Sequence, residues 1–512
     1  MKPVMRRRTF LGLVPVAGLV TVAGCAPIPS AGSAAQGPPG VFRYAYELTP
    51  SRLDPHRASI SQDGVTLFPA YDRLVHQSPV GEPEPGLARA WAWEDPLALR
   101  LDLRPGVTFH DGTPFDAAAV KANIERAKTV QGSAVRTELD PISSVEVRDP
   151  MTAVLRLSYP SASLPAVLSD RAGAMVSPKA LADGLDLDAV AVGAGMYRMV
   201  EHRRGQITRF ERYPGYWDPA AAASEKLEIH HIADAATRLN AVRTGVVDAC
   251  RVPPALLDQA KQTGLEVSTA GSLNFNYFVL NRARSAFGDL RVRRALNHAL
   301  DREAIRQGVY RGLATVSAQP FVPGYWAYDA DLGDAAIRFD PDLARRLLAE
   351  AGVGDGLRFS TVIPTGSDYQ PLAEAIQAQL SAVGVTMEIS PAAPDTMGDL
   401  MFVQERYDAM LASWGPRADP SMTVATRYTA NGFGNPGGQT TPRLEELHKQ
   451  ALATTDPGAR AAVMHDLVDE VVDQVLEIPV VFPEDVVVQS PRVVGLVPRL
   501  MHRPEFRGVT VR

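Results

Sequence analysis

Cysteine is scarce in this chain, and the short motifs that mark the common catalytic classes are missing. The 512 residues include two cysteines, Cys25 and Cys250. The sequence contains no Gly-x-Ser-x-Gly elbow, no His-Glu-x-x-His pair and no Gly-rich loop that ends in Lys-Ser or Lys-Thr. Those motifs are typical of serine hydrolases, zinc proteases and P-loop NTPases. We therefore expect a protein that is not an enzyme and needs no cofactor, with a secreted hydrolase as a distant alternative because paired carboxylates need no motif.

Positive charge is outnumbered by negative charge. The sequence has 52 Lys and Arg residues against 58 Asp and Glu residues, which gives a net charge of −6. Nucleic-acid binding requires basic patches, and electrostatic adhesion to anionic lipid requires clustered Lys and Arg. We therefore expect no nucleic-acid partner and no attachment to lipid by charge alone.

Long apolar runs are also absent, apart from Leu11–Ala23 near the start. This run follows the basic residues Arg6–Arg8 and ends at Val22-Ala23-Gly24-Cys25. A basic start, a short apolar region and small residues at its end are typical of an export signal, and the run is too short to span a bilayer comfortably. The last four residues resemble a lipoprotein processing box, which would make Cys25 the lipidated N-terminus. Removal of residues 1–25 takes away four basic and no acidic side chains, so the mature chain would carry a charge near −10.

The first residues also bear on the export route and on attachment to the membrane. Arg6-Arg7-Arg8-Thr9-Phe10-Leu11 resembles a twin-arginine motif, but Arg-Arg also occurs by chance in Sec signals, so both routes stay open. Residues 26–40 are uncharged and rich in Pro, Gly and Ala, a composition typical of a flexible tether. The sequence predicts an extracytoplasmic body, on the periplasmic or cell-surface side, anchored to the cell membrane through Cys25.

The remaining body is too long for one hydrophobic core. It has about 470 residues, whereas single cores stop growing at roughly 250–300, so two or more lobes are expected. Strands alternate with helices over residues 341–389, which favours parallel sheets and α/β lobes. If Cys25 is lipidated, Cys250 has no partner for a disulfide, and its apolar neighbours predict a buried, inert thiol.

The most informative stretch is Leu103–Arg126, which reads LRPGVTFHDGTPFDAAAVKANIER. Leucines alternate with charged residues over 99–104, which predicts a strand, and Pro-Gly and Asp-Gly dipeptides predict turns. Phe109 and Phe115 flank the second turn, and we expect them to pack together. Asp116 stands where it would cap the helix that follows.

This stretch resembles the signature of the family 5 solute-binding proteins of ABC importers, the branch that binds peptides, nickel chelates and related solutes. Further family elements follow in order across residues 41–500. They are the Leu-Asp-Pro element at Leu53–Pro55, the turn at Gly193–Tyr197, the Tyr-Trp turn at Tyr213–Trp217 and the helix at Arg291–Arg302. The second of these departs from the family's Gly-Thr-Gly-Pro-Tyr pattern at Ala194 and Met196.

The resemblance implies a two-lobe, periplasmic-binding-protein-like α/β fold of type II, with an extra inserted subdomain and a ligand cleft between the lobes. The first lobe would comprise residues 41–75, 186–271 and 480–512. The inserted subdomain would span residues 76–185, and the second lobe residues 272–479.

The resemblance also implies a function. A monomeric, lipid-anchored protein of this kind closes around a peptide or peptide-sized solute and delivers it to a membrane permease, which a separate ATPase powers. A metal chelate or another anionic small solute is the alternative ligand in the same role. The sequence does not separate transport from sensing or envelope adhesion.

The strongest site candidates lie in the segment Trp414–Pro420, which resembles the family's Trp-Gly-x-x-x-Asp-Pro segment. The family's Trp lines the pocket, so Trp414 would stack on the ligand, unless it is a core residue. Peptide-binding members carry an Asp three residues after this Trp that grips the ligand's α-ammonium group. Arg417 stands there instead, and a guanidinium favours a carboxylate or another anion. Asp419 would either take over the ammonium group or turn the chain as part of Asp-Pro.

Further candidates come from other parts of the chain. In nickel-chelate binders an Arg of the inserted subdomain grips the chelator's carboxylates, and Arg171 falls at about that place, unless it is a surface arginine. Three more residues lie near expected strand ends or hinges, where ligands of such folds bind: Tyr46, Asn276 and Tyr277. No metal site is expected, because Ser421 stands where a liganding His would be sought, and His230 and His231 point to opposite faces of a strand.

Overall fold

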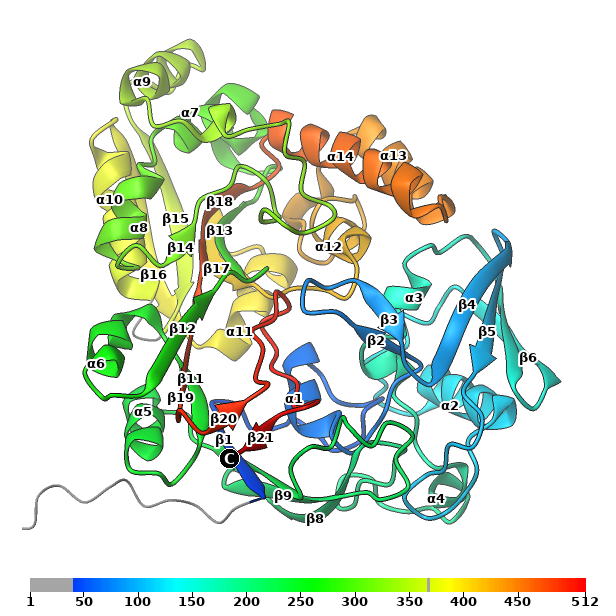
Figure 1. Ribbon diagram of the computed structural model, residues 1–512. Helices are drawn as coiled ribbons and strands as arrows, with labels where there is room; N and C mark the ends of the chain where they lie inside the picture. The colour runs from blue at the N-terminus through cyan, green and yellow to red at the C-terminus, as the bar shows by residue number, and fades with distance from the viewer. Residues whose placement is uncertain (1–39, 366–368) are drawn as a thin grey trace, which may run out of the picture.

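The computed structural model describes residues 40–365 and 369–512, which are arranged around three main β-sheets (Figure 1). A seven-stranded and a six-stranded sheet form the two large lobes, and a four-stranded sheet forms a smaller body beside them. Each sheet is packed against its own clusters of buried apolar side chains. The architecture is therefore the predicted two-lobe α/β fold. In the described part of the chain, no helix is long and apolar enough to cross a membrane.

The first sheet has the strand order β12-β19-β11-β1-β10-β9-β8. Its strands are β1 (Val41–Tyr46), β8 (Tyr197–Arg203), β9 (Ile207–Arg212), β10 (Lys226–His231), β11 (Ala249–Val252), β12 (Glu266–Ala270) and β19 (Asp485–Gln489). The helices of this lobe are α1 (Gly64–Leu67), α5 (Ala235–Arg243) and α6 (Leu257–Lys261). β1 runs parallel to β10 and β11, and α5 connects those two strands. Cys250 on β11 is fully buried, and burial raises the pKa of its thiol to about 12, which confirms the predicted buried thiol.

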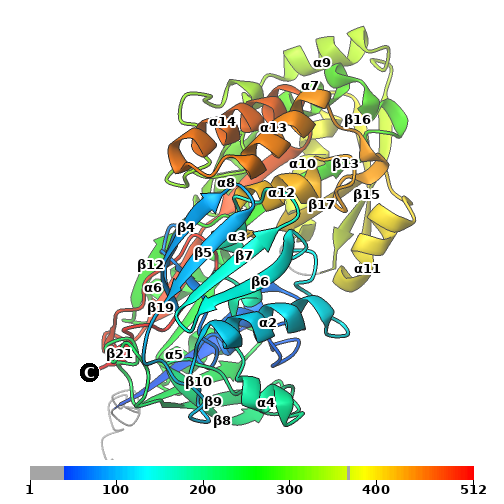
Figure 2. The same cartoon turned by 90° about the vertical axis from the view of Figure 1, so that its right-hand side faces the viewer.

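The smaller body is an antiparallel sheet in the order β4-β5-β7-β6, flanked by α2 (Figure 2). Its elements are β4 (Ala88–Asp95), β5 (Ala98–Leu103), α2 (Ala117–Thr129), β6 (Ile142–Asp149), β7 (Thr152–Leu157), α3 (Leu164–Val167) and α4 (Pro178–Ala182), with the hairpin β2 (Val75–Gln77) and β3 (Pro83–Pro85) beside them. The Asp116 carboxylate accepts a hydrogen bond from the Ala119 amide at 2.9 Å and caps α2, as predicted. The rings of Phe109 and Phe115 meet edge to face with centroids 6.1 Å apart, which confirms that they pack together.

The second sheet has the order β14-β18-β13-β17-β15-β16. Its strands are β13 (Phe275–Leu280), β14 (Ala314–Thr315), β15 (Leu357–Pro364), β16 (Val385–Ala392), β17 (Ala409–Trp414) and β18 (Ile478–Pro483). The helices of this lobe are α7 (Leu290–His298), α8 (Arg302–Gly308), α9 (Pro341–Glu350), α10 (Tyr369–Ser381), α11 (Pro394–Gly398), α12 (Pro420–Arg427), α13 (Pro442–Ala453) and α14 (Pro457–Asp473). β15 is parallel to both β16 and β17, so the expected crossover arrangement is present.

One expected helix is divided in two. The pattern over Arg291–Arg302 predicts a single helix, but α7 ends at His298 and α8 begins at Arg302. The Asp301 side chain accepts a hydrogen bond from the Ala304 amide at 2.8 Å and starts the second helix. The apolar face persists across the break, which is why the sequence pattern alone did not reveal it.

The chain returns from the second lobe to the first between β18 and β19. β18 still pairs with β13 and β14 of the second sheet, whereas β19 pairs with β11 and β12 of the first. The crossing therefore falls at Glu484, and the expected boundary at residue 480 lies inside β18. The division into lobes and inserted subdomain otherwise stays our proposal.

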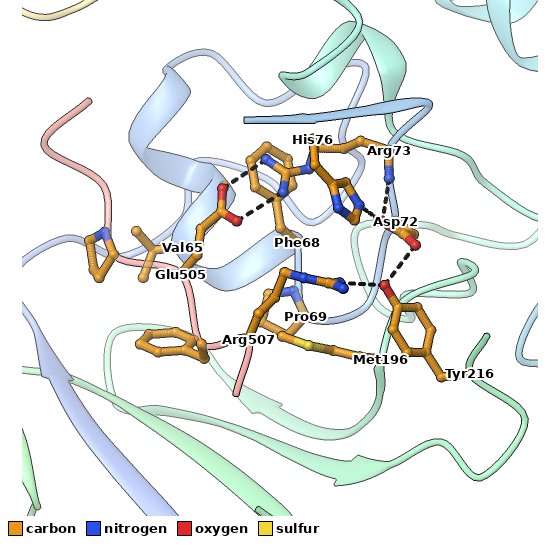
Figure 3. Close-up of a pocket in the computed structure, with 13 residues that line it drawn as sticks. Val65, Phe68, Pro69, Asp72, Arg73, His76, Met196, Tyr216, Glu505 and Arg507 are labelled. Atoms are coloured by element: carbon orange, nitrogen blue, oxygen red, sulfur yellow. Dashed lines mark hydrogen bonds and ion pairs between the residues drawn. The ribbon is translucent and has the colours of Figure 1, made fainter. Parts of the chain in front are cut away.

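The C-terminal segment, residues 491–512, lies across the first lobe and contains the short strands β20 (Val493–Val494) and β21 (Thr510–Val511). Figure 3 shows its polar side chains converging on a cavity of about 20 Å³. Glu505 accepts two hydrogen bonds from Arg73, at 2.9 and 3.1 Å, and Arg507 donates to the Tyr216 hydroxyl at 2.6 Å. That hydroxyl donates in turn to Asp72 at 2.8 Å. This cavity has room for about one water molecule. The hydrogen bonds around it anchor the C-terminal segment to the first lobe.

Candidate functional site

Two cavities adjoin each other on the second lobe, and the larger one extends across the junction to the first lobe. The larger has a volume of about 680 Å³, and its wall combines residues of both lobes. The first-lobe side includes Glu47, Asp234, Arg238, Arg251, Glu484 and Asp485, and the second-lobe side includes Asn276, Tyr310, Tyr369 and Ser413. The smaller cavity, about 520 Å³, lies against β17 and α11. Tyr369 and Ser413 line both cavities, so together they form one cleft.

An ion-pair network fixes the first-lobe wall of the larger cavity. Arg251 pairs with Glu47 and, at 3.4 Å, with Asp485, and it donates to the His502 carbonyl at 3.1 Å. Arg238 donates to the carbonyls of Ile232, Ala233 and Arg251 at 2.7–3.0 Å. These bonds hold both guanidiniums, so the wall is preformed. The cavity wall includes four carboxylates and two guanidiniums, so it carries an acidic excess.

Asn276 lies in the cavity wall, but Tyr46 does not lie where a ligand could reach it. The Asn276 amide on β13 donates to the Tyr310 hydroxyl at 2.6 Å, across the second-lobe side of the cavity. Tyr46 is 1% exposed in the first-lobe core, and its hydroxyl donates to the Gln62 carbonyl at 3.3 Å. Its neighbour Glu47 lines the cavity instead, as strand alternation would have indicated.

Trp414 lies at the second-lobe edge of the cleft, and Arg417 lies beside it. Trp414 ends β17, lines the smaller cavity and donates from its indole nitrogen to the Thr423 hydroxyl at 3.2 Å. The Arg417 guanidinium stacks over the Trp414 ring, 4.9 Å from its centroid. Burial lowers the pKa of Arg417, and no ion pair joins it to any residue of the described part of the chain. This pair therefore combines an aromatic surface with a cation that has no ion pair to a described residue.

Asp419 is already fully engaged. It is 2% exposed, caps α12 by accepting a hydrogen bond from the Ser421 amide at 2.9 Å, and forms a two-point ion pair with Arg460 at 2.7 and 2.8 Å. Because a guanidinium already neutralises it, the carboxylate does not need an ammonium group from a ligand. The geometry favours the interpretation that Asp-Pro turns the chain here.

Arg171 is buried, so the surface alternative is wrong. It follows Asp170 in the inserted subdomain, is 3% exposed, and donates to the Ala58 carbonyl. Its guanidinium also lies 3.7 Å from a carboxylate oxygen of Glu138 and 3.7 Å from one of Asp170. Burial lowers the pKa of Arg417 in the second lobe, and the positive charge of Arg171 acts in the same direction.

Tyr277 belongs to a buried cluster whose edge lines the smaller cavity. The Arg427 guanidinium lies 3.6 Å from the Tyr277 ring centroid and pairs with Glu477. The Tyr428 hydroxyl donates to the same carboxylate at 2.5 Å. Tyr277 therefore stabilises the wall behind Trp414 and offers a ligand only part of its ring.

No cluster in the described residues has the three His, Cys, Asp or Glu side chains that a metal site needs. His231 is buried with Leu227 and Ile229 on one face of β10, and it bonds to Thr208 and to the Leu48 carbonyl. His230 lies 3.1 Å from Glu228. Cys25, the expected lipidation site, lies outside the described residues.

The sequence did not reveal several residues that build the site, among them Glu47, Glu138, Arg251 and Tyr310. Glu138 lies in a loop before β6, and Arg251 lies on a short strand in the first sheet. Neither belongs to a local motif, because each acquires its role from residues far away in the sequence. Strand alternation was the one available signal, and it applied only to Glu47.

Comparison with known proteins places this arrangement in a family. The family model for bacterial extracellular solute-binding proteins, family 5 Middle, matches residues 82–435. A glutathione-binding protein of Salmonella paratyphi A is 33% identical over 306 residues, which is 58% of this chain and 58% of the relative's length. The structure of HbpA2 from Haemophilus parasuis has a TM-score of 0.81 at 24% identity, covering 92% of this chain and all of that one (100%).

A further structure, NikZ from Campylobacter jejuni in complex with Ni(L-His), has a TM-score of 0.76 at 22% identity and covers 90% of this chain and 96% of its own. These two structural similarities support the fold alone. The family model covers well over half of the sequence and includes the signature Leu103–Arg126 and the segment around Trp414. The chain therefore belongs to the family 5 extracellular solute-binding proteins.

Proposed function

We propose that this protein captures a peptide or peptide-sized solute in the cleft between its lobes and delivers it to the permease of an ABC importer. Closure of the lobes around the ligand would create the form that docks on the permease, and a separate ATPase would drive transport. We propose that it acts as a monomer and not as an enzyme.

The observation that carries this proposal is the Trp414–Arg417 pair at the edge of the cleft. An aromatic ring beside a half-buried guanidinium without an ion-pair partner among the described residues suits a ligand with a planar or apolar part next to a carboxylate. The larger cavity, with its acidic excess, suits the ammonium end of the same molecule. A peptide carries both groups, so we propose that its carboxylate end faces Arg417.

The alternative ligand is a metal chelate or another small anion. A second cation, Arg171, favours a ligand with more than one carboxylate. Glutathione and carboxylate chelators both meet that description, and the names of the relatives include binders of glutathione and of a nickel–histidine complex. The metal of such a chelate would be part of the cargo.

Mass spectrometry of whatever co-purifies with residues 26–512, first native and then after denaturing release, tests the proposal directly. Released peptides support peptide import. A chelate or another small anion supports the alternative ligand and leaves the transport role intact. A protein that carries nothing, and that binds no member of a broad peptide and chelate panel by calorimetry, would count against both.

We also propose that lipid on Cys25 anchors the protein to the outer side of the cell membrane, after export by the Sec or the twin-arginine route. The support is the sequence pattern of residues 1–25. A Cys25→Ser variant expressed in the native host should leave the membrane fraction, while the wild type stays there with an acylated N-terminus. Equal partitioning of the two would refute the anchor.

A further inference from the structure

A partly buried ionic cluster spans the seam between the proposed inserted subdomain and the second lobe. Glu138 and Arg171 come from the inserted subdomain and Arg417 from the second lobe. The Arg171 guanidinium lies 3.7 Å from Glu138, and the two side chains are 4% and 13% exposed, respectively. A backbone hydrogen bond of 2.8 Å from the Ala162 amide to the Leu452 carbonyl also crosses this seam. Cations from both sides of the seam therefore act on one carboxyl group.

The two carboxylates of this cluster are in unequal positions. Asp170 has three partners of its own: an ion pair with Arg503 at 3.2 Å, a hydrogen bond from the Ser61 hydroxyl at 2.5 Å and one from the Arg171 amide at 2.7 Å. Glu138 has no hydrogen bond to any described residue, and its ion pair with Arg171 is longer than a hydrogen bond. Glu138 is thus a buried carboxyl group that its surroundings compensate poorly.

Three charged groups face Glu138: Arg171, Asp170 and Arg417. Burial raises the pKa of Glu138 to about 7, with Asp170 acting in the same direction and the two arginines in the opposite one. A carboxyl group with such a pKa changes its charge in the neutral range, unlike an exposed glutamate.

We propose that Glu138 is a specificity-determining residue that competes with the ligand's anionic group for Arg171 and Arg417. This inference rests on the proposed function, because it concerns the same cation, Arg417. When Glu138 is ionised, its negative charge offsets the positive charge of the two guanidiniums and repels an incoming carboxylate. When it is protonated, it no longer offsets the charge of the two cations, which then attract the anion, and the neutral carboxyl becomes a hydrogen-bond donor to it.

The proposal predicts that binding of an anion takes up a proton. Affinity should rise as the pH falls through 7, because the binding-competent fraction is the one with neutral Glu138. If the anion binds only to that fraction, the apparent affinity at pH 8 is about tenfold weaker than at pH 6.

Isothermal titration calorimetry at pH 6 and pH 8 tests this prediction with two probes. One is glutathione, whose carboxylates stay ionised throughout, and the other is inorganic sulfate at constant ionic strength. Glu138→Gln should bind equally at both pH values, with the affinity that the wild type has at pH 6. Glu125→Gln is the matched control, because Glu125 is exposed on α2 of the same subdomain, and it should behave like the wild type. Arg417→Met lacks one of the two proposed anion-binding cations, so its affinity gives the background binding at both pH values.

The outcomes separate this inference from the proposed function. If Glu138→Gln keeps the pH dependence of the wild type, or if the wild type has none, the inference is wrong even though glutathione binds. If sulfate shows the expected pattern but no peptide or chelate binds, Glu138 has the proposed role and the import proposal fails. An absence of anion binding in every variant would also overturn the inference.

Discussion

Two arginines of the second lobe show how strongly the partners of a single residue determine its role. Arg460 is buried against Asp419 and forms two hydrogen bonds with that carboxylate. Arg417 lies three residues after Trp414 and has no ion pair within the described ranges. The first residue therefore stabilises the lobe, whereas we propose that the second binds the ligand.

Replacement of Arg460 by Met should destabilise the protein by about 3–5 kcal/mol, because it leaves the buried Asp419 without a counter-charge. Urea unfolding followed by circular dichroism measures the change. Arg417→Met is the matched control, since it breaks no ion pair, and its free energy of unfolding should stay within about 1 kcal/mol of the wild type. Equal losses in the two variants would show that Arg417 has a structural partner after all.

The same Arg417→Met variant should lose affinity for a carboxylate-bearing ligand. A hydrogen bond to a charged group contributes about 1.5–3 kcal/mol, so the dissociation constant should rise by roughly 10- to 100-fold. Calorimetry with the ligand recovered by mass spectrometry measures the change. The control is Arg406→Met, an exposed arginine of the same lobe that stacks on Tyr407. Unchanged binding in Arg417→Met would remove this residue from the site.

At the scale of elements, local sequence predicts most helices and strands because their signals are local. Asp116 and Asp301 each cap the helix that follows, and alternation in β10 and β5 separates the buried from the exposed face. The division between α7 and α8 was missed, because an apolar face continued through it. The role of the C-terminal segment was also invisible to local patterns, because its partners are Arg73 and Tyr216, far away in the sequence.

The anchoring of this segment should make stability depend on pH. Although burial alone would raise it, Arg73 and Arg499 hold the pKa of Glu505 well below its ordinary value. A carboxyl whose pKa is lowered by folding stabilises the protein above its unfolded pKa, about 4.3 for Glu, and this contribution is lost as the pH falls toward its folded pKa.

Glu505→Gln should therefore be much less stable than the wild type at pH 7, by about 3–5 kcal/mol, because Arg73 becomes a buried charge without a partner. The difference should narrow as the pH falls from 5 to 3, because the unfolded wild type takes up a proton at Glu505 below about pH 4.3 while the folded protein keeps this carboxylate ionised. Urea unfolding at pH 7, 5, 4 and 3 measures the difference in the free energy of unfolding between the wild type and Glu505→Gln. A difference that stays constant over this pH range would contradict the ion pair between Arg73 and Glu505.

At the scale of the whole molecule, we expect ligand binding to close the two lobes. The backbone hydrogen bond from Ala162 to Leu452 crosses the seam between the proposed inserted subdomain and the second lobe. A bond of this kind breaks whenever the lobes open, whereas bonds within a sheet do not. Amide exchange at Ala162 therefore reports the fraction of time that the lobes spend open.

Saturation with ligand should slow hydrogen exchange in peptides that contain the Ala162 amide, because ligand binding favours the closed state. Hydrogen–deuterium exchange with mass spectrometry measures this effect. Peptides from β7, in the interior of the four-stranded sheet, serve as the control and should exchange at the same slow rate with and without ligand. Equal exchange at Ala162 in the two states would mean that binding does not involve closure of this seam.

The sequence by itself determined the family signature, the α/β alternation, the helix caps and the unusual cation at Arg417. All of these are properties of short segments, in which propensity, periodicity and turn chemistry act between neighbours. Only the tertiary structure decided that Asp419 is neutralised by Arg460, that Tyr46 is buried while Glu47 lines the cleft, and that Glu138 meets Arg171 and Arg417. The reason is physical: charge compensation and burial depend on residues that the fold brings together, and their separation in sequence carries no local signal.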